Sequence, residues 1–280
     1  LDQLIAKRVP VLFVGEAGSG KTKLVMDKLD HLPDDMMYSV INFNYYTDSA
    51  TLQRIMEGPL EKKHGNRFGP PGTRRLVYFI DDLNMPEGDI YNTQQPIALL
   101  RQHLDYGHFY DRNKMVLKEV AGCQYVAALN PTVGSFTVNP RLQRHFAIFA
   151  VNFPAGDSLE RMFGSVLRGH MAAQAFDDSI VKYSTKVLAA ILFIHKKVTS
   201  TFVPTAIKFH YQFNLRDISA VFQGMLQSTP STLHSVREYA LLTLHECYRV
   251  YGDRLVNETD LGTFEGILQE SVRKQFEELG

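Results

Sequence analysis

The sequence predicts an α/β fold, with a large domain built on a parallel five-stranded sheet followed by a smaller helical domain. Two observations carry this expectation. Up to about residue 154, short apolar runs alternate with helix-like segments, which is typical of a parallel sheet covered by helices on both faces. Beyond Pro154-Ala155-Gly156, apolar residues recur only at the three- and four-residue spacing of helices. We therefore expect domains over residues 1–154 and 155–280.

The expected strands of the large domain are short apolar runs, which suits strands that are buried on both faces. The segment His64–Arg75 is rich in Gly, Pro and Arg, and we expect a loop there. Near residues 110–120, Asp111-Arg112-Asn113 separates two short extended runs, which predicts an inserted hairpin. The five strands are expected at residues 9–14, 38–43, 76–80, 123–129 and 145–153.

Helix signals lie between these strands and fill the second half. A helix is expected at Lys21–Leu29, a second from a cap at Thr47-Asp48-Ser49 to about Glu57, and a third from a cap at Thr93 to about Tyr106. Two later helices show continuous apolar faces. Their residues are Ile180, Tyr183, Val187, Ile191, Ile194 and Val198 in one, and Val236, Ala240, Leu244, Cys247 and Tyr251 in the other.

Composition and charge narrow the class of protein. Hydrophobic residues make up 45% of the chain and charged residues 21%, which is a globular composition. The 30 basic and 30 acidic side chains cancel, which argues against a nucleic-acid coat or a polybasic membrane anchor. No apolar run suits a transmembrane helix, and no signal-peptide layout is seen. Cys123 and Cys247 predict two buried free thiols. Because the chain does not begin with Met, we expect a fragment of a longer protein.

The segment Gly15-Glu16-Ala17-Gly18-Ser19-Gly20-Lys21-Thr22 matches the phosphate-binding loop pattern G-x-x-x-x-G-K-[ST] in full. It follows an expected strand and opens an expected helix, which is the context that this motif requires. Its glycines allow backbone N–H groups to curl around phosphate oxygens, and the helix N-terminus adds positive charge. We expect Lys21 to reach the β- and γ-phosphates and the Thr22 hydroxyl to ligate Mg²⁺.

The strand at 76–80 ends in two acids, Asp81 and Asp82. An acidic end to a strand is common by itself. Paired with a phosphate-binding loop about 60 residues upstream, Asp81 is expected to bind Mg²⁺.

Four segments make the chain similar to a known family. A phosphate-binding loop, an apolar strand with paired acids, a polar residue ending a later strand and a helical lid together resemble the AAA+ ATPases. Closer still, the chain resembles the third AAA+ module of axonemal dynein heavy chains over its whole length. The segments that carry this resemblance are Phe79-Ile80-Asp81-Asp82-Leu83-Asn84-Met85-Pro86, Thr93-Gln94-Gln95-Pro96-Ile97-Ala98-Leu99-Leu100-Arg101-Gln102, Asn139-Pro140-Arg141-Leu142-Gln143-Arg144-His145-Phe146 and Phe209-His210-Tyr211-Gln212-Phe213-Asn214-Leu215-Arg216-Asp217.

The resemblance implies roles for three further residues. Asn130 ends the fourth strand, where AAA+ proteins place a residue that senses the γ-phosphate and positions water; as a plain turn residue before Pro131 it would also be ordinary. Arg216 sits in the first turn of a lid helix capped by Asn214 and Asp217, where a cation opposes the helix dipole. The resemblance makes Arg216 the lid arginine that reaches the nucleotide, against the alternative of a surface ion pair.

The third residue is an arginine finger acting in trans, either Arg141 or Arg144, just before the fifth strand. Such a finger neutralises charge on the phosphoryl group at the neighbouring module's site. We favour Arg144 because it lies closer to the strand.

One residue departs from the family pattern. Where AAA+ proteins usually have Asp-Glu, this chain has Asp81-Asp82, so the second acid is one methylene shorter. Because general-base action requires hydrogen-bond reach to the water, Asp82 predicts tight binding and slow turnover. The alternative is a nucleotide-loaded structural module that does not hydrolyse ATP.

The resemblance also implies ligands, partners and a place in the cell. The ligands are ATP or ADP with Mg²⁺, and the partners are neighbouring AAA+ modules of the same heavy chain and other dynein subunits. Microtubules are contacted only indirectly, because no long heptad stretch is present. Nucleic acid and membrane are not expected partners. The expected location is the cytoplasm and cytoskeleton, in the axoneme of a cilium or flagellum.

Overall fold

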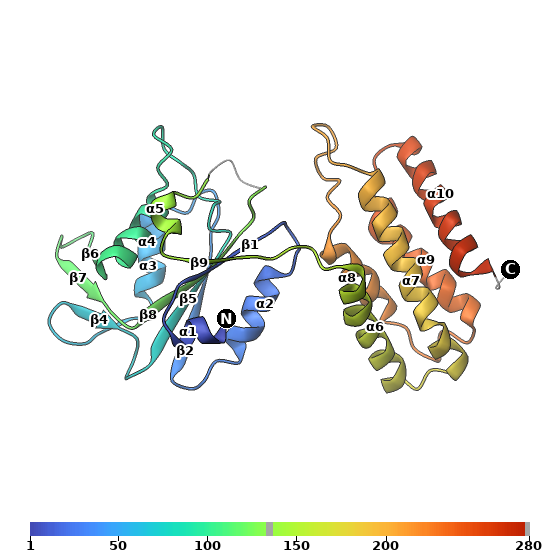
Figure 1. Cartoon of the computed structure of the whole chain (residues 1–280), viewed down its shortest axis with the longest axis horizontal. Helices are drawn as coiled ribbons and strands as arrows, with labels where there is room; N and C mark the ends of the chain where they lie inside the picture. Colours follow the sequence, from blue (N-terminus) through green and yellow to red (C-terminus); the bar gives the residue numbers. More distant parts are fainter. Residues whose placement is uncertain (133–136, 278–280) are drawn as a thin grey trace. The chain divides into compact units, whose positions relative to one another are not determined.

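The computed structural model describes residues 1–132 and 137–277. The chain divides into two compact units, Leu1–Asn152 and Phe153–Gly280. Figure 1 shows that the first, called the large unit below, is built around a sheet, whereas the second, the helical unit, consists of helices. Each unit has its own hydrophobic core.

A five-stranded parallel sheet forms the centre of the large unit, as the sequence predicts. Its strand order is β2-β5-β8-β1-β9, and every neighbouring pair is parallel. The apolar runs become strands because both faces of the sheet are covered. The bounds are β1 Val11–Val14, β2 Met36–Asn42, β5 Arg75–Asp81, β8 Cys123–Leu129 and β9 Ala147–Ala150.

Alternate residues of the central strands enter two different cores. Phe13 packs with residues of α2 on one face, and Leu12 packs with residues of α3 and α4 on the other. The result is a three-layer arrangement, with helices on both faces of the sheet (Figure 1). One face carries α1 Asp2–Ala6 and α2 Lys21–Asp30, and the other carries α3 Ser49–Glu57, α4 Gln95–Tyr106 and α5 Pro140–Gln143.

A second, small sheet lies beside the first and corrects one expectation. Its order is β3-β4-β7-β6, and β6 and β7 form an antiparallel hairpin. The segment expected to be a loop contains β4, which pairs with β7 in parallel. The Gly and Pro residues of this segment favour a loop prediction. Its strand pairing leaves no local sign in the sequence, because the partner strand comes about 50 residues later. The bounds are β3 Glu61–Lys62, β4 Arg67–Gly69, β6 His108–Tyr110 and β7 Leu117–Val120.

The expected cap of α4 is wrong. The N-cap residue is Gln94, not Thr93, and no side-chain bond caps this helix. The buried Gln94 amide instead donates to the backbone oxygens of Pro86 at 2.7 Å and Asn84 at 3.3 Å. By contrast, the Asp48 side chain caps α3 by accepting from the Thr51 N–H, as predicted.

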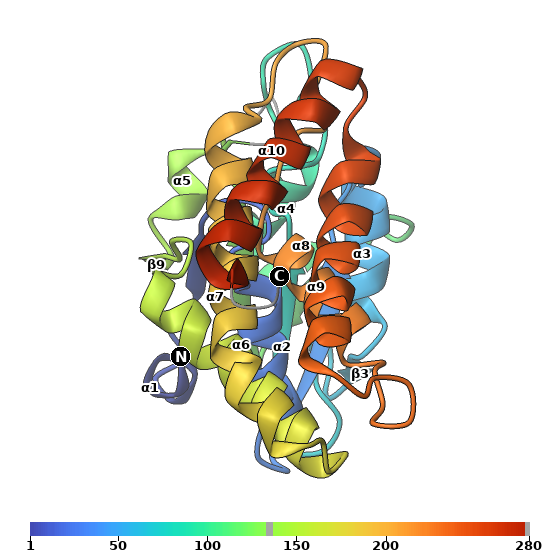
Figure 2. The same cartoon turned by 90° about the vertical axis from the view of Figure 1, so that its right-hand side faces the viewer.

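The helical unit is a bundle around the long helix α7. Helices α6, α9 and α10 pack against α7, and α8 packs against α9; Figure 2 shows α7, α9 and α10 beside one another. Cys247 is buried in α9, whereas Cys123 is only half-buried, which corrects the expectation of two buried thiols. No helix in the described part of the chain has the length and apolar character needed to span a membrane. The bounds are α6 Gly156–Ala173, α7 Asp178–Thr201, α8 Leu215–Met225, α9 Val236–Tyr251, a 3-10 turn Gly252–Arg254 and α10 Glu258–Gln275.

Candidate functional site

The sheet order brings the phosphate-binding loop, Asp81 and Asn130 to one edge of the sheet. β8 lies between β5 and β1, and all three strands run in the same direction. The phosphate-binding loop follows β1, Asp81 ends β5, and Asn130 follows β8. Ligand sites of open α/β sheets lie at this carboxyl edge.

The loop takes a conformation that its glycines allow. Gly18 and Gly20 have φ angles of 74° and 94°, in the region that side chains rarely adopt. Gly15 is required for a different reason, because a Cβ at this position would lie 2.1 Å from the Val151 carbonyl oxygen. Gly20 is the N-cap of α2, so the loop leads directly into the positive end of a ten-residue helix.

The ammonium group of Lys21 is enclosed by this loop. Its side chain is buried, and Nζ donates to the carbonyl oxygens of Gly15 and Glu16, both at 2.8 Å. The Ser19 hydroxyl oxygen lies 3.4 Å from the same nitrogen. A buried cation therefore sits within the loop, and phosphate oxygens are the kind of acceptor that it can exchange for these carbonyls.

Thr22 and Asp81 meet across the edge of the sheet. The Thr22 hydroxyl donates to Asp81 Oδ2 at 2.7 Å, although the residues are 59 positions apart in the sequence. A hydroxyl and a carboxylate in contact are oxygen ligands that suit Mg²⁺, which usually binds one or two such groups together with phosphates and water. No group of three or more His, Cys, Asp or Glu side chains within residues 1–132 and 137–277 offers an alternative metal site. The residues present therefore fit a Mg²⁺ ion that is held jointly with a nucleotide.

Asp82 lies beside this pair in an unusual backbone conformation. Its φ angle is 56°, its side chain is exposed, and its N–H donates to Asp81 Oδ1 at 3.1 Å. The next N–H, of Leu83, donates to the Ala128 carbonyl oxygen at 3.0 Å and ties the segment to β8. The strand end that carries both acids is thus held by bonds to its neighbours.

Asn130 is buried at the end of β8, and its amide oxygen faces its own turn. Oδ1 accepts from the Thr132 hydroxyl at 2.8 Å and from the Thr132 N–H at 3.1 Å. Its carbonyl oxygen accepts from Asn84 Nδ2 at 2.9 Å. Asn84 is itself buried and accepts from Gln94, so these amides link the segment after β5 to the end of β8. In the sequence, Asn84 and Gln94 stand out only as part of the family resemblance. Their link to Asn130 could not be predicted, because no local spacing connects these residues.

Arg141 and Arg144, the two arginines before the fifth strand, take no part in the contacts of the phosphate-binding loop described above. Arg144 follows α5, and its Nη2 donates to Asp105 Oδ1 of α4 at 2.5 Å. Its side chain is nevertheless 61% exposed. Arg141 is exposed as well, and its N–H donates to the Asn139 side chain that caps α5.

Arg216 belongs to the helical unit. It is exposed in the first turn of α8, and its N–H donates to Asn214 Oδ1 at 2.9 Å. The predicted capping box of Asn214 and Asp217 is confirmed. Asp217 also forms an ion pair with Arg254 at 2.6 Å, so this acid is already partnered.

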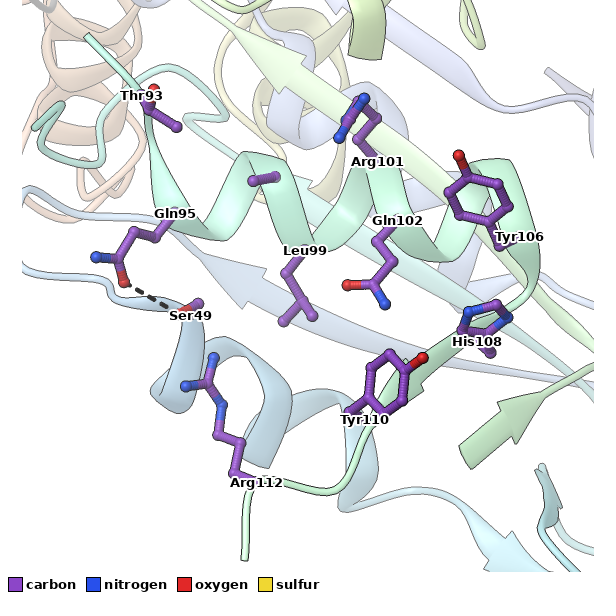
Figure 3. Close-up of a pocket in the computed structure, with 11 residues that line it drawn as sticks. Ser49, Thr93, Gln95, Leu99, Arg101, Gln102, Tyr106, His108, Tyr110 and Arg112 are labelled. Carbon is purple, nitrogen blue, oxygen red and sulfur yellow. Dashed lines mark hydrogen bonds between the residues drawn. The ribbon is translucent and has the colours of Figure 1, made fainter. Parts of the chain in front are cut away.

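A separate hollow of about 590 Å³ lies between α3, α4 and the β6 hairpin (Figure 3). Arg101, Gln102 and Tyr106 border it from α4, and Tyr110 and Arg112 border it from the hairpin. None of the site residues predicted from the sequence lines this hollow.

Comparisons with known proteins identify the families that both parts of the chain match. Residues 1–154 match a family model described as the P-loop containing dynein motor region, and residues 187–280 match an AAA+ lid domain. The chain is 53% identical over 279 residues to the ciliary dynein beta chain of Tripneustes gratilla, covering 100% of this chain and 6% of that one.

Two further relatives show similar coverage. Dynein axonemal heavy chain 11 of Sus scrofa is 51% identical over 277 residues, and the flagellar outer arm dynein alpha chain of Chlamydomonas reinhardtii is 48% identical over 277 residues. In both cases 99% of this chain and 6% of the relative are covered, so the chain spans only about 6% of the length of the curated relatives it matches. The chain belongs to the AAA+ P-loop motor region of the axonemal dynein heavy chains.

Proposed function

We propose that the chain is the third AAA+ module of an axonemal dynein heavy chain, which binds ATP or ADP with Mg²⁺, hydrolyses ATP slowly and regulates the motor from within its ring. The observation that carries this proposal is the contact between the Thr22 hydroxyl and Asp81 beside the loop that encloses Lys21. A turn that merely connects a strand and a helix does not require a buried cation beside a paired hydroxyl and carboxylate.

The loop would bind the nucleotide through backbone N–H groups and Lys21. Lys21 would exchange its contacts with loop carbonyls for the β- and γ-phosphates, where its charge offsets theirs. Thr22 and Asp81 would hold Mg²⁺, which supplies charge neutralisation between the phosphates when it is bound. The domains proposed for these tasks are the large domain over 1–154 and the lid over 155–280.

Hydrolysis would depend on Asp82 and Asn130. Asp82 would accept a proton from the attacking water, and Asn130 would orient that water beside the γ-phosphate. The shorter side chain of Asp82 supports slow rather than absent turnover, because it keeps the charge and loses only reach. A nucleotide-loaded module without hydrolysis is the second candidate, and it would hold if the lost reach of Asp82 prevented proton transfer altogether.

Communication would run through two arginines. Arg144 would serve as a finger at the adjacent module's site, and its exposed side chain supports this role. Arg216 would contact the γ-phosphate from the lid only while the triphosphate exists, so the lid orientation would follow the nucleotide state. Neighbouring modules of the same heavy chain and other dynein subunits are the proposed partners, and microtubules are reached only through other parts of the motor.

Calorimetric titration of MgATP and MgADP tests the binding site. We expect Lys21→Ala to abolish measurable binding, because it removes the cation nearest to the β/γ charge. The matched control is Lys23→Ala, which removes an exposed lysine from the same helical turn and should bind as the parent does. Unchanged affinity in a folded Lys21→Ala variant would overturn the assignment. Single-turnover phosphate release in the assembled motor then separates slow hydrolysis from none.

A further inference from the structure

Three buried amide side chains link the start of α4 to the end of β8. Gln94 Nε2 donates to the carbonyl oxygens of Pro86 at 2.7 Å and Asn84 at 3.3 Å. Asn84 Nδ2 in turn donates to the carbonyl oxygen of Asn130 at 2.9 Å. Gln94, Asn84 and Asn130 are all buried. Because a buried polar group that loses its partner costs free energy, this chain of bonds restrains the backbone at each of its members.

We propose that Gln94 and Asn84 are positioning residues for Asn130, which hold it where its amide contacts the γ-phosphate. This inference rests on the role of Asn130 proposed above. In this task both residues act only through Asn130 and do not contact the nucleotide themselves. They therefore affect the binding of a triphosphate but not the binding of a diphosphate.

The backbone of Asn130 lies just beyond the support of the sheet. β8 ends at Leu129, whose carbonyl oxygen accepts the Gly15 N–H at 3.2 Å. The residue after Asn130 is Pro131, which has no N–H to donate. The carbonyl oxygen of Asn130 is held by the side chain of Asn84 instead of by a further ladder bond of the sheet.

The side chain of Asn130 keeps its donor group available for a ligand. Its Oδ1 accepts from the hydroxyl and the N–H of Thr132, and these bonds do not use Nδ2, the donor group of the amide. An amide nitrogen is a suitable donor to a phosphate oxygen. With the carbonyl oxygen held by Asn84 and the amide oxygen held by Thr132, the direction in which Nδ2 donates is fixed.

The segment after β5 that carries Asn84 is held from two sides. On one side, the Leu83 N–H donates to the Ala128 carbonyl oxygen at 3.0 Å, which ties the segment to β8. On the other side, the Gln94 amide bonds to the Asn84 carbonyl oxygen. Loss of this amide frees the second side, so that Asn84 holds Asn130 less precisely. Small misplacements of a group that contacts the reacting phosphate are costly.

The residue type at position 94 suits this task better than it suits helix capping. Gln94 is the N-cap of α4, but its side chain makes no capping bond. The usual caps are Ser, Thr, Asp and Asn, whose short side chains accept from N–H groups of the first turn. A glutamine amide carries two N–H donors, and Gln94 directs its amide to two carbonyl oxygens outside the helix.

The test compares the binding of MgATPγS, a triphosphate analogue, with that of MgADP. Calorimetry on the assembled heavy-chain motor, with its other nucleotide sites disabled, gives the ratio of the Kd for MgADP to the Kd for MgATPγS. We expect Asn130→Ala to lower this ratio roughly tenfold, the effect of losing one hydrogen bond to a charged group. Gln94→Leu should lower the ratio roughly three- to tenfold and leave the Kd for MgADP within about twofold.

Further variants separate positioning from a general loss of stability. In the Asn130→Ala background, Gln94→Leu should lower the ratio no further, because both residues act through the same amide. Asn84→Ala should repeat the effect of Gln94→Leu, and it decides the question if Gln94→Leu does not fold. The matched control is Gln53→Leu in α3, which removes another buried glutamine whose amide donates to the Tyr110 carbonyl oxygen at 2.8 Å. It should lower the free energy of unfolding and leave the ratio unchanged.

The outcomes separate the inference from the proposed function. If Asn130→Ala lowers the ratio whereas Gln94→Leu and Asn84→Ala keep the parent value, the positioning inference is overturned and the role of Asn130 stands. An equal fall in Gln53→Leu, or a further fall in the double variant, also overturns the inference, because the effect then does not run through Asn130. If Asn130→Ala keeps the parent ratio, the proposed sensing role is wrong, and the inference is overturned with it.

Discussion

Asp82 combines a short side chain with a constrained backbone. Its φ of 56° lies in the left-handed region, which Asp and Asn tolerate better than other side chains except Gly. The bond from Leu83 to β8 keeps this conformation in place. The direction of its Cβ is therefore set by the backbone, and reach toward a water depends on side-chain length alone.

Changing the length and charge of residue 82 tests its proposed role. We expect Asp82→Asn, which suits the same backbone, to abolish hydrolysis without weakening binding. Asp82→Glu should raise the rate, because the added methylene restores reach. The measurement is single-turnover phosphate release in an assembled motor whose other sites are silenced, with thermal unfolding as the control for backbone strain. Hydrolysis by Asp82→Asn at the parent rate would show that Asp82 is not the base.

The contact between Thr22 and Asp81 makes a prediction about metal dependence. Removing Mg²⁺ with EDTA should weaken ATP binding by the parent chain, because the ion neutralises charge between the phosphates and the protein. In Thr22→Val the affinity with Mg²⁺ should fall close to the value in EDTA, because the hydroxyl ligand is lost. Thr263→Val removes a hydroxyl from α10 that donates to a helix carbonyl, and it should keep the full Mg²⁺ effect. An equal Mg²⁺ effect in Thr22→Val and the parent would exclude the hydroxyl as a ligand.

At the scale of elements, α3 and α4 begin in different ways. The Asp48 carboxylate satisfies an N–H of the first turn of α3 at 2.8 Å, and its bonds to Thr51 hold the pKa of Asp48 below its ordinary value. α4 begins without a side-chain cap, and buried Gln94 connects its start to the segment after β5. The start of α4 is therefore stabilised by tertiary contacts rather than by a local cap.

Thermal unfolding distinguishes these two helix starts. Asp48→Ala should lower Tm by about 2–4 °C, the usual effect of losing an N-cap in a chain of this size. Thr93→Ala should leave Tm within about 1 °C, because Thr93 caps nothing in the structure. Equal losses in the two variants would contradict the different roles of these residues.

At the scale of the whole molecule, each of the two units contains a buried histidine that is favoured in its neutral form. His195 of the helical unit lies 3.0 Å from the Tyr251 hydroxyl and stacks on Phe153. Burial lowers the pKa of His195 to about 4, against the opposing charge of Asp217. In the large unit, burial also lowers the pKa of His103, which contacts the Tyr125 hydroxyl at 2.6 Å.

These histidines predict loss of stability in acid. Because the folded pKa of His195 lies below the unfolded value of 6.5, its contribution is complete above pH 6.5 and is lost as pH falls toward 4. By pH 5 the loss should reach about 2 kcal/mol. Urea unfolding of the chain at pH 7.5 and pH 5, followed by circular dichroism, measures it. His195→Gln, which does not titrate, should show a smaller drop, and an equal drop in both proteins would contradict the assignment.

By itself the sequence determined the features that local spacing encodes. The phosphate-binding loop, the five central strands and the caps at Asp48 and Asn214 follow from patterns of fewer than ten residues. Such patterns report backbone geometry directly, because a positive φ favours Gly and a helix start favours a short polar side chain.

Only the tertiary structure decided the contacts between distant segments. The pairing of β4 with β7, the bond between Thr22 and Asp81 and the contact of Arg144 with Asp105 join residues 39 or more positions apart. No local pattern encodes such pairs, since each depends on which strand lies beside which. The order of the strands follows from the need to bury both faces of the sheet under helices. This need is a property of the whole chain rather than of any one segment.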